Sequence, residues 1–432
     1  MTANSPFFEF LELPLFNTGL TQSNKQIGKE IIMSDSLIVK PEDLIDCAAV
    51  AAQIRHAIHQ YPEIGLNLTQ TEKTIVEALK SFGCEDIHTR VGGSDVAGVV
   101  CVIKGECPGR TIGIRADSDA LPLNENTGVP YASERPKHMH ACGHDGHVAT
   151  LLAVVNYFMK HRHFAGTLVA IFQPGEEGFA GAKYMIEDGL VERFGIDEFY
   201  ALHAEPSLDV GTVGFISGYA TANADVFEVT FEGKGGHGSR PQFARDPVIA
   251  MSEAILALQT LVSRNISPQL AAVVSVCCAQ AGDPNGVSVI PQKAMLSGTT
   301  RSYEPEVQDT IERRINEIAH GIAKTYDIDA EVKYTRLYPA MYNTPEKVEA
   351  AHAIATQVLG ENNVKEITRT TGGEDFSFML QKRPGCLFRL GMKDADHTAP
   401  VHNERFNFND KAIATGAAVL ASIALTRMLP NS

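Results

Sequence analysis

Histidines are concentrated in one short stretch of this 432-residue chain, since six of its 15 histidines fall between residues 138 and 163. The stretch contains the run His140-Ala-Cys142-Gly-His144-Asp145-Gly-His147. Cysteine thiolates and imidazoles together suit Zn²⁺ and similar divalent metals. A plainer interpretation is a polar loop that Asp145 caps at the start of a helix over residues 148–159. The mixture of ligand types favours the metal site.

A pair of adjacent carboxylates forms the second feature. The segment Gln173-Pro174-Gly175-Glu176-Glu177-Gly178 follows an apolar strand predicted over residues 167–172. Two carboxylates in a tight turn repel each other unless a cation neutralises at least one of them. A solvated acidic turn would have the same sequence, so the pair alone does not decide between the two interpretations.

The position of these residues along the chain favours a shared site. Asp117 and Asp119 follow the strand predicted over 111–115, and His203 follows the strand predicted over 199–202. Ligands of open α/β sheets bind outside the carboxyl ends of the strands. We therefore expect these side chains and the glutamate pair to lie together at one edge of a sheet.

The elements that must position these residues alternate between helix and strand. Apolar residues at helical spacing predict helices, and short apolar runs predict strands. Alternating strands and helices imply a mainly parallel sheet covered on both faces, so the predicted fold class is α/β. The predicted helices span 41–60, 69–82 and 148–159, and the predicted strands span 96–103, 111–115, 167–172 and 199–202.

The middle of the chain has a different pattern. Phe227, Val229 and Phe231 alternate with polar residues, which predicts a half-buried strand over 226–232. A helix at 247–263, strands near 271–279 and 294–301, a helix at 305–325 and a strand at 330–338 follow. This β-α-β-β-α-β order is that of a ferredoxin-like unit.

Four segments are therefore predicted: an N-terminal extension over 1–35, a first part of the catalytic domain over 36–220, an inserted lid or dimerisation domain over 221–336, and a second part of the catalytic domain over 337–432. In that last part, a helix at 345–359, a strand at 386–390 and a helix at 410–428 complete the first domain.

Composition excludes several classes of protein. The chain has 37 basic and 52 acidic residues, a net charge of −15, and nucleic-acid binders normally carry a basic stripe instead. No apolar run approaches the roughly 18 to 20 residues of a membrane-spanning helix. Nucleic-acid and membrane partners are therefore not expected.

The N-terminus and the cysteines point to the cytoplasm. No basic residue precedes Lys25, whereas a secretory signal needs a positive region before its apolar core. Residues 1–32 are expected to be a loosely ordered extension, with Met33 as an alternative start. The eight cysteines form no C-x-x-C pair, so all except Cys142 are expected to be small, mostly buried hydrophobic residues in a reducing compartment.

Several motifs together resemble one family. The chain resembles the M20 metallopeptidases, and within them the amidohydrolase branch that includes hippurate hydrolases, aminoacylase-like enzymes and plant auxin-conjugate hydrolases. The resemblance covers about residues 50–428. It rests on the two segments above and on Arg115-Ala-Asp117-Ser-Asp119-Ala-Leu-Pro122, Leu202-His203, Gly233-Lys-Gly-Gly-His237, Gly298-Thr-Thr-Arg301, Gly373-Glu374-Asp375-Phe376 and Pro400-Val-His402-Asn403.

The resemblance implies a two-metal site and the substrate class. The metals would be two divalent ions per subunit, Zn²⁺ or Mn²⁺, with Co²⁺ as a further option. The substrate would be a small N-acyl amino acid, hydrolysed at its amide bond by a homodimer or higher homo-oligomer. The implied metal ligands are Cys142, His144, Glu177, His203 and His402.

The remaining site residues also take their roles from the resemblance. Glu176 would be the general base, and Asp119 would orient a metal ligand. His237 would help to stabilise the oxyanion, and Arg301 would hold the substrate's carboxylate with its planar fork. One departure affects specificity, because Ser288 stands where the family usually has asparagine before Val-Ile-Pro.

Three alternatives stay open to different degrees. The nearest is a dipeptidase or carboxypeptidase with the same two-metal site. A non-catalytic metal-binding protein is disfavoured, because structural zinc sites are compact and rich in cysteine, whereas these ligands span residues 142 to 402 and include one cysteine. A nucleotide-binding protein is disfavoured further, because Gly233-Lys-Gly-Gly matches neither a P-loop nor a dinucleotide fingerprint.

Overall fold

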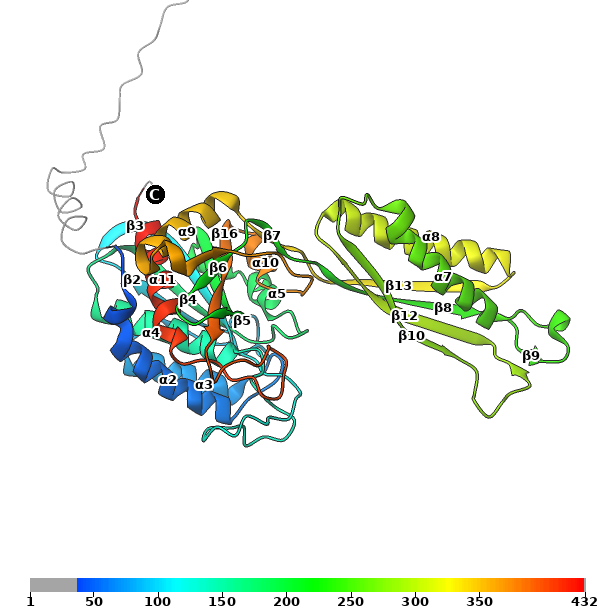
Figure 1. Ribbon diagram of the computed structural model, residues 1–432, viewed down its shortest axis with the longest axis horizontal. Helices are drawn as coiled ribbons and strands as arrows, with labels where there is room; N and C mark the ends of the chain where they lie inside the picture. The colour runs from blue at the N-terminus through cyan, green and yellow to red at the C-terminus, as the bar shows by residue number, and fades with distance from the viewer. Residues whose placement is uncertain (1–36, 431–432) are drawn as a thin grey trace, which may run out of the picture. The chain divides into compact units, whose positions relative to one another are not determined.

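The computed structural model describes residues 37–430 (Figure 1). The predicted extension over 1–35 and the alternative start at Met33 lie outside the described residues.

A mainly parallel sheet forms the centre of the fold. Its eight strands lie in the order β1-β2-β4-β3-β5-β16-β6-β15. Strands β4, β3, β5 and β16 are neighbours and run parallel, so their carboxyl ends share one edge. The predicted α/β class and mainly parallel sheet are thus confirmed. The strands span Ile87–His88 (β1), Val99–Lys104 (β2), Cys107–Asp117 (β3), Ala165–Gln173 (β4), Glu198–Asp209 (β5), Val213–Phe215 (β6), Val364–Glu366 (β15) and Gly385–Lys393 (β16).

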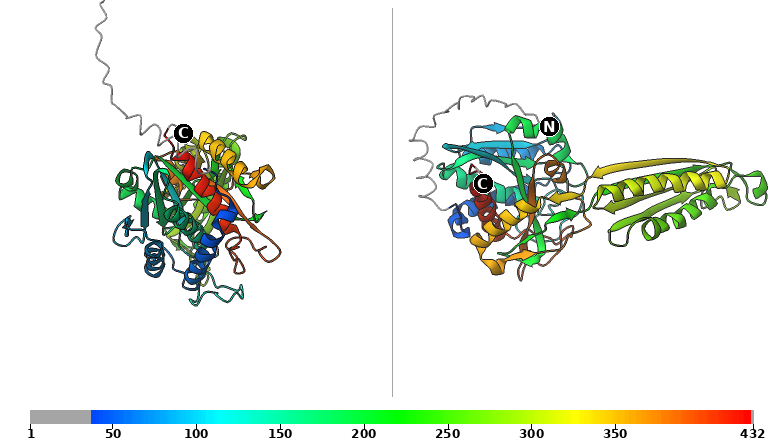
Figure 2. Two further views of the ribbon diagram at one scale, coloured as in Figure 1. Left: turned by 90° about the vertical axis from the view of Figure 1, so that its left-hand side faces the viewer. Right: turned by 90° about the horizontal axis from the view of Figure 1, so that it is seen from above.

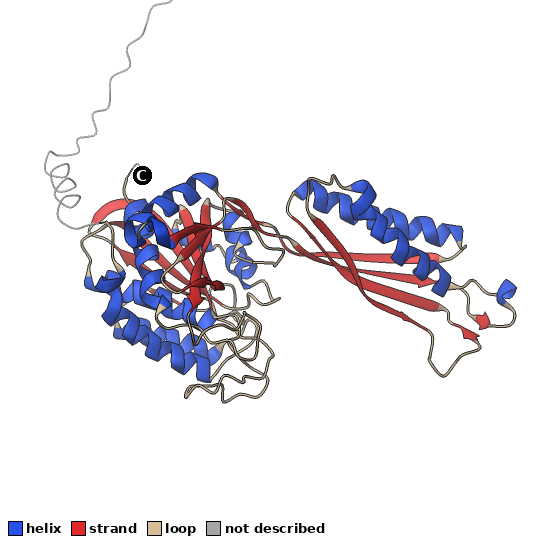
Figure 3. Cartoon of the chain, in the orientation of Figure 1, coloured by secondary structure: helices blue, strands red, loops and turns tan. Residues whose placement is uncertain are grey.

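Helices cover both faces of this sheet (Figures 2 and 3). Successive strand residues point to opposite faces. Thus Leu168 and Ala170 of β4 pack in one apolar cluster, and Val169 and Ile171 in the other. Helices α2 (Ile45–Gln60), α3 (Thr69–Ser81), α4 (His144–Lys160), α9 (Pro345–Leu359) and α11 (Ala412–Arg427) cover the first face, and α5 (Gly181–Glu187), α6 (Leu190–Phe194) and α10 (Ser377–Leu380) the second.

The insert has a sheet of its own. It consists of four antiparallel strands in the order β10-β12-β8-β13, and the chain order is β-α-β-β-α-β, as the sequence predicts. Both helices pack on one face of this sheet (Figure 3). The elements are β8 (Ala224–Glu232), α7 (Pro247–Asn265), β10 (Ala272–Ala281), β12 (Lys293–Ser302), α8 (Pro305–Thr325) and β13 (Asp329–Tyr338). The domain boundaries themselves stay a prediction.

Two short pairs of strands complete the described chain, and neither is predicted from the sequence. Strand β7 (Gly218–Thr221) pairs with β14 (Met341–Asn343), and β9 (Gly236–His237) pairs with β11 (Val289–Ile290). Strands of two to four residues are too short to show a period-2 pattern.

Within residues 37–430, no helix is both long and apolar enough to cross a membrane. None of the eight cysteines forms a disulfide. Cys47, Cys84, Cys101 and Cys386 are buried as expected, whereas Cys277 on β10 is exposed.

A buried ion cluster joins the start of β5 to the last helix. Glu198 accepts from Arg427 Nη2 at 2.8 Å, Lys347 Nζ at 2.6 Å and Tyr200 Oη at 2.7 Å, and it lies 2.7 Å from Arg110 Nη2. Burial raises the pKa of this carboxyl, but the hydrogen bonds from Arg427, Lys347 and Tyr200 outweigh it and lower the pKa from 4.5 to about 2.

This cluster predicts acid sensitivity. A depressed pKa contributes stability above the unfolded value of 4.5, and that stability is lost as pH falls toward 2. Glu198→Gln should therefore lower the free energy of unfolding by about 3 to 5 kcal/mol at pH 7, because it leaves Arg427 and the two partly exposed cations without their buried acid. The difference from wild type should shrink below pH 4.5 in urea melts. Glu361→Gln, at an exposed position, is the control; a deficit for Glu198→Gln that does not change with pH would contradict the assignment.

Candidate metal centre

The candidate residues come together at the carboxyl ends of the parallel strands. Asp117 ends β3, and the glutamate pair follows β4. His203 lies within β5 and does not follow it as predicted, because β5 continues to Asp209. His144 is the first residue of α4, which begins four residues earlier than the predicted helix. The loop between β16 and α11 supplies His402, whose φ of +61° is unusual for a residue other than glycine.

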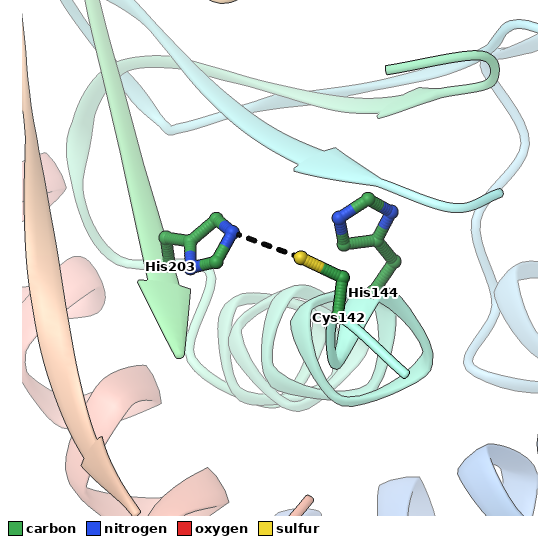
Figure 4. A group of neighbouring side chains, drawn as sticks. All are labelled: Cys142, His144 and His203. Carbon is green, nitrogen blue, oxygen red and sulfur yellow. Dashed lines mark hydrogen bonds between the residues drawn. The ribbon is translucent and has the colours of Figure 1, made fainter. Parts of the chain in front are cut away.

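Five metal-competent side chains form two groups that share one thiol. Ligand atoms of Cys142, His144 and His203 lie within 4.8 Å of one another, and so do those of Cys142, Glu177 and His402. Figure 4 shows the first group, in which Cys142 Sγ is 3.4 Å from His203 Nε2. In the second group, His402 Nε2 is 3.1 Å from Glu177 Oε1. The structure therefore brings together all five residues implied as ligands by the family resemblance.

Hydrogen bonds orient the rings of His144 and His203 so that each can bind a metal ion. His144 Nδ1 lies 3.0 Å from the carbonyl oxygen of Asp119, and His203 Nδ1 lies 2.8 Å from that of Ala204. Each carbonyl fixes the proton on Nδ1 and leaves the lone pair on Nε2. Nε2 of His144 is buried and has no hydrogen-bond partner among the described residues. A cation at this position would satisfy it.

His147 differs from these two histidines. Its Nδ1 lies 2.5 Å from Asp117 Oδ1, and its Nε2 accepts from the backbone N–H of Ala204 at 2.9 Å. Both ring nitrogens are engaged, so His147 fixes the backbone beside His203 instead of offering a lone pair.

Asp119 fixes the two glutamates. Its Oδ1 accepts from the backbone N–H of Glu176 at 2.9 Å, and its Oδ2 accepts from that of Glu177 at 3.0 Å. Its own carbonyl holds the ring of His144. One buried acid thus orients both the acidic turn and one imidazole.

The electrostatics of the site separate the two glutamates. Burial, followed by the nearby Glu374, Asp375 and Glu177, raises the pKa of Glu176 well above its ordinary value. Burial opposes ionisation of Glu177 as well, but the hydrogen bond from His402 and the charge of His144 give it a lowered pKa. Glu176 is therefore the more proton-accepting of the two in this environment.

Asp145 is not a helix cap, contrary to the plainer interpretation of the histidine stretch. It lies inside α4, whose first turn carries no apolar periodicity that could reveal it. Its Oδ2 accepts from Arg55 Nη1 at 2.8 Å and lies 2.8 Å from His59 Nδ1. These buried contacts anchor the segment that carries Cys142.

A buried arginine network under the site is not predicted from the sequence. Arg115 Nη1 lies 2.8 Å from Asp117 Oδ2, and its Nη2 lies 3.0 Å from Glu374 Oε1 and 2.9 Å from Asp375 Oδ1. Segments 115–122 and 373–376 are both motifs of the family resemblance, but their pairing needs the folded chain, because they are far apart in the sequence.

Tyr338 also contacts the site and is not predicted. It is the last residue of β13, and its hydroxyl donates to the carbonyl of Glu176 at 2.5 Å. The same hydroxyl accepts from the backbone N–H of Ala180 at 3.1 Å. It therefore closes the loop that carries both glutamates and ties that loop to the point where the insert ends.

We expect Tyr338→Phe to lower kcat by about 10-fold with little change in KM or metal content, since a lost hydrogen bond of about 1 to 1.5 kcal/mol loosens the Glu176 loop. Steady-state kinetics and metal analysis check this. Tyr342→Phe, at a half-exposed ring outside the loop, is the matched control. An equal fall in both variants would show that Tyr338 does not position Glu176.

Arg301 reaches the site, and His237 does not. Arg301 on β12 lines a cavity of about 450 Å³ together with Cys142, Glu176 and His402. Its Nη1 donates to the carbonyl of Thr300 at 2.8 Å. His237 on β9 is exposed, and its Nδ1 accepts from the backbone N–H of Ser239 at 3.1 Å.

Ser288 lies beside His237. Its carbonyl accepts from the N–H of Gly238 at 2.7 Å, across the β9–β11 pair. The departure from the family pattern therefore affects the surroundings of His237 and not the metal-competent groups. Asn285, which precedes Ser288 in the same hairpin, is also exposed.

Paired metal-competent groups beside a buried carboxylate, at the carboxyl ends of parallel strands, define a metal-binding hydrolase. The family model of peptidase family M20/M25/M40 matches residues 113–426. The chain belongs to this family.

Three relatives illustrate the range of similarity. The hippurate hydrolase of Campylobacter jejuni is 37% identical over 384 residues, which cover 89% of this chain and 98% of that protein. The N-acetyldiaminopimelate deacetylase of Lactobacillus helveticus is 33% identical over 378 residues, 87% of this chain and 97% of that protein. The crystal structure of the Bacillus subtilis YxeP protein, a dinuclear metal binding peptidase from the M20 family, has a TM-score of 0.76 at 30% identity and covers 89% of this chain and 99% of that one.

Proposed function

We propose that this protein is a metal-dependent amidohydrolase that cleaves the amide bond of N-acyl amino acids to a carboxylic acid and a free amino acid. The observation that carries this proposal is the pair of ligand groups that share Cys142, which lines one cavity together with the buried Glu176. Relatives that act on hippurate and on N-acetyldiaminopimelate support the substrate class.

We assign the metal site to Cys142, His144, Glu177, His203 and His402, with two divalent ions per subunit, Zn²⁺ or Mn²⁺, and Co²⁺ as an alternative. Imidazole, thiolate and carboxylate donors suit these ions. Burial raises the pKa of the Cys142 thiol to about 12, so metal binding must displace its proton. Divalent ions in such a site polarise an amide carbonyl and lower the pKa of water.

Glu176 is the proposed general base. Its buried carboxylate takes a proton from the water whose oxygen adds to the amide carbon. It then delivers that proton to the nitrogen as the C–N bond breaks, so the amine leaves neutral. Asp119 supports this role by holding the backbone of Glu176.

Arg301 and His237 are assigned to the substrate. Arg301 lines the cavity and is assigned to the free carboxylate of the amino acid. His237 is assigned to the oxyanion that develops on the amide oxygen. Because His237 lies outside the cavity of its own chain, this role requires either closure of the insert as a lid or a second subunit.

We also propose that the protein forms a homodimer. Strand β10 is an edge strand of the insert's sheet, and its sequence from Ala272 to Ala281 contains no charged residue. Such an edge is suited to pair with another strand. Light scattering of the wild type and of Val273→Lys tests this. We also propose a cytoplasmic location, on the composition and the thiols.

A substrate panel tests the proposed function. The metal-free protein is loaded with Zn²⁺, Mn²⁺ or Co²⁺ and assayed on N-acetyl and N-benzoyl amino acids and on dipeptides. Turnover of acylated amino acids at a higher kcat/KM than dipeptides supports the proposal. Selective turnover of dipeptides would replace it with a dipeptidase or carboxypeptidase, and activity of the metal-free protein equal to the loaded one would remove the metal assignment.

A further inference from the structure

A second arginine lies in the catalytic cavity. Arg389 is on β16, in register with His203 on β5 and with Gly214 on β6. Residues in register on neighbouring strands point to the same face of a sheet, so its side chain lies beside the imidazole of His203. It lines the cavity that contains Cys142 and Glu177, and only 9% of the residue is exposed.

Arg389 differs from the other buried arginines. Each of the other three has a carboxylate at 2.8 Å: Asp145 for Arg55, Asp117 for Arg115 and Glu198 for Arg427. For Arg389, the described residues provide no ion pair within 4.0 Å and no side-chain hydrogen bond. A guanidinium that lines a cavity without a carboxylate partner is free to bind an anion from outside the chain.

The nearest carboxylate in register does not serve this purpose. Glu205 pairs with Gly391, two residues along both strands, and also lines the cavity. Its Oε1 accepts from the hydroxyl of Ser207 at 2.7 Å and from the backbone N–H of Ser207 at 3.2 Å. These contacts turn the carboxylate back to its own strand.

We propose that Arg389 binds a second carboxylate of the substrate, so that the preferred substrates are N-acyl amino acids with two carboxylates. This inference rests on the proposed function, in which Arg301 holds the first carboxylate. Both arginines line one cavity but come from strands of different sheets, Arg301 from β12 and Arg389 from β16. A guanidinium binds a carboxylate through two parallel N–H donors, which a neutral amide cannot accept in the same way.

The second carboxylate has two sources, the amino acid side chain or the acyl group. A comparison of kcat/KM for N-acetyl-L-glutamate and N-acetyl-L-glutamine tests whether the second carboxylate belongs to the amino acid side chain. The same comparison for N-succinyl-L-alanine and its terminal succinamide tests whether the second carboxylate belongs to the acyl group. Each pair changes one charged group at nearly constant shape, and the wild type should prefer the dianion of one pair by about 30-fold or more in kcat/KM.

Arg389→Met keeps the length of the side chain and removes the charge. It should abolish that preference and change kcat/KM on the neutral partner by less than about 3-fold, with metal content and Tm unchanged. Arg389→Lys should restore part of the preference, because it returns the charge without the fork. If Arg389→Met does not fold, the inference is tested by the preference of the wild type for the dianion and by its partial loss in Arg389→Lys.

Binding of glutarate provides a readout that does not depend on turnover. Calorimetry on the metal-loaded protein should give a Kd for glutarate that rises about 30-fold in Arg389→Met. Failure of the proposed function would appear as no turnover of any N-acyl amino acid, with this difference in Kd intact. Equal losses on charged and neutral substrates, or a wild type without preference and with an unchanged Kd for glutarate in Arg389→Met, would overturn the inference.

Discussion

Glu176→Gln is expected to lower kcat by about 10² to 10⁴-fold while both metal ions stay bound. The amide keeps the shape of the side chain and cannot accept the proton from water. The carboxylate of Asp119 holds the backbone N–H of residue 176, which the substitution leaves in place. The loop should therefore stay folded, and the loss should fall on the chemical step.

Glu177→Ala is the matched comparison, because it changes the neighbouring residue of the same turn. Glu177 lies among the ligand atoms of Cys142 and His402, so its removal should lower the metal content as well as the rate. Metal analysis after dialysis, beside kcat and KM, separates the two variants. Near-normal activity in Glu176→Gln would show that Glu176 is not the general base. Loss of metal from Glu176→Gln with retention in Glu177→Ala would exchange the roles of the two glutamates.

The long periodic elements are those that the sequence predicts best. The helix predicted over 305–325 has those bounds in the structure, because Pro305 starts it and its apolar residues recur at helical spacing. The β-α-β-β-α-β order of the insert follows from elements of the same kind. Strands β6 and β15 have three residues each and depend on neighbours in the sheet, so no local pattern reveals them.

The residues of the site also differ in how far the sequence predicts them. Residues that follow predicted strands, such as Glu176 and His203, are visible because their types are unusual in their local sequence. Tyr338 and Arg389 are not, because each is an ordinary residue of a strand. The importance of Tyr338 comes from its hydrogen bond to the carbonyl of Glu176. That of Arg389 comes from its place in the cavity without an ion pair to any carboxylate of the described residues.

His237→Ala is expected to lower kcat by roughly 10²-fold or more with metal content unchanged, since removal of one oxyanion donor has an effect of this size. The length of β8 separates His237 from the cavity of its own chain. Ala224 lines the cavity and begins β8, which runs for 9 residues to Glu232, and His237 follows. At ~3.3 Å per residue the strand alone spans about 30 Å. β9 lies toward that far end of the insert's sheet (Figure 1).

Such a span favours the proposed route in which a second subunit completes the site. Mixed dimers of His237→Ala and Glu176→Gln distinguish this from closure within one subunit. If His237 acts across the interface, the His237→Ala subunit keeps its own Glu176 and receives an intact histidine from its partner, so one site of the two regains activity. If His237 acts within its own chain, each subunit lacks one essential group and no site recovers. Verified mixed dimers without recovery would therefore exclude the cross-subunit route, and normal activity of His237→Ala alone would exclude both routes.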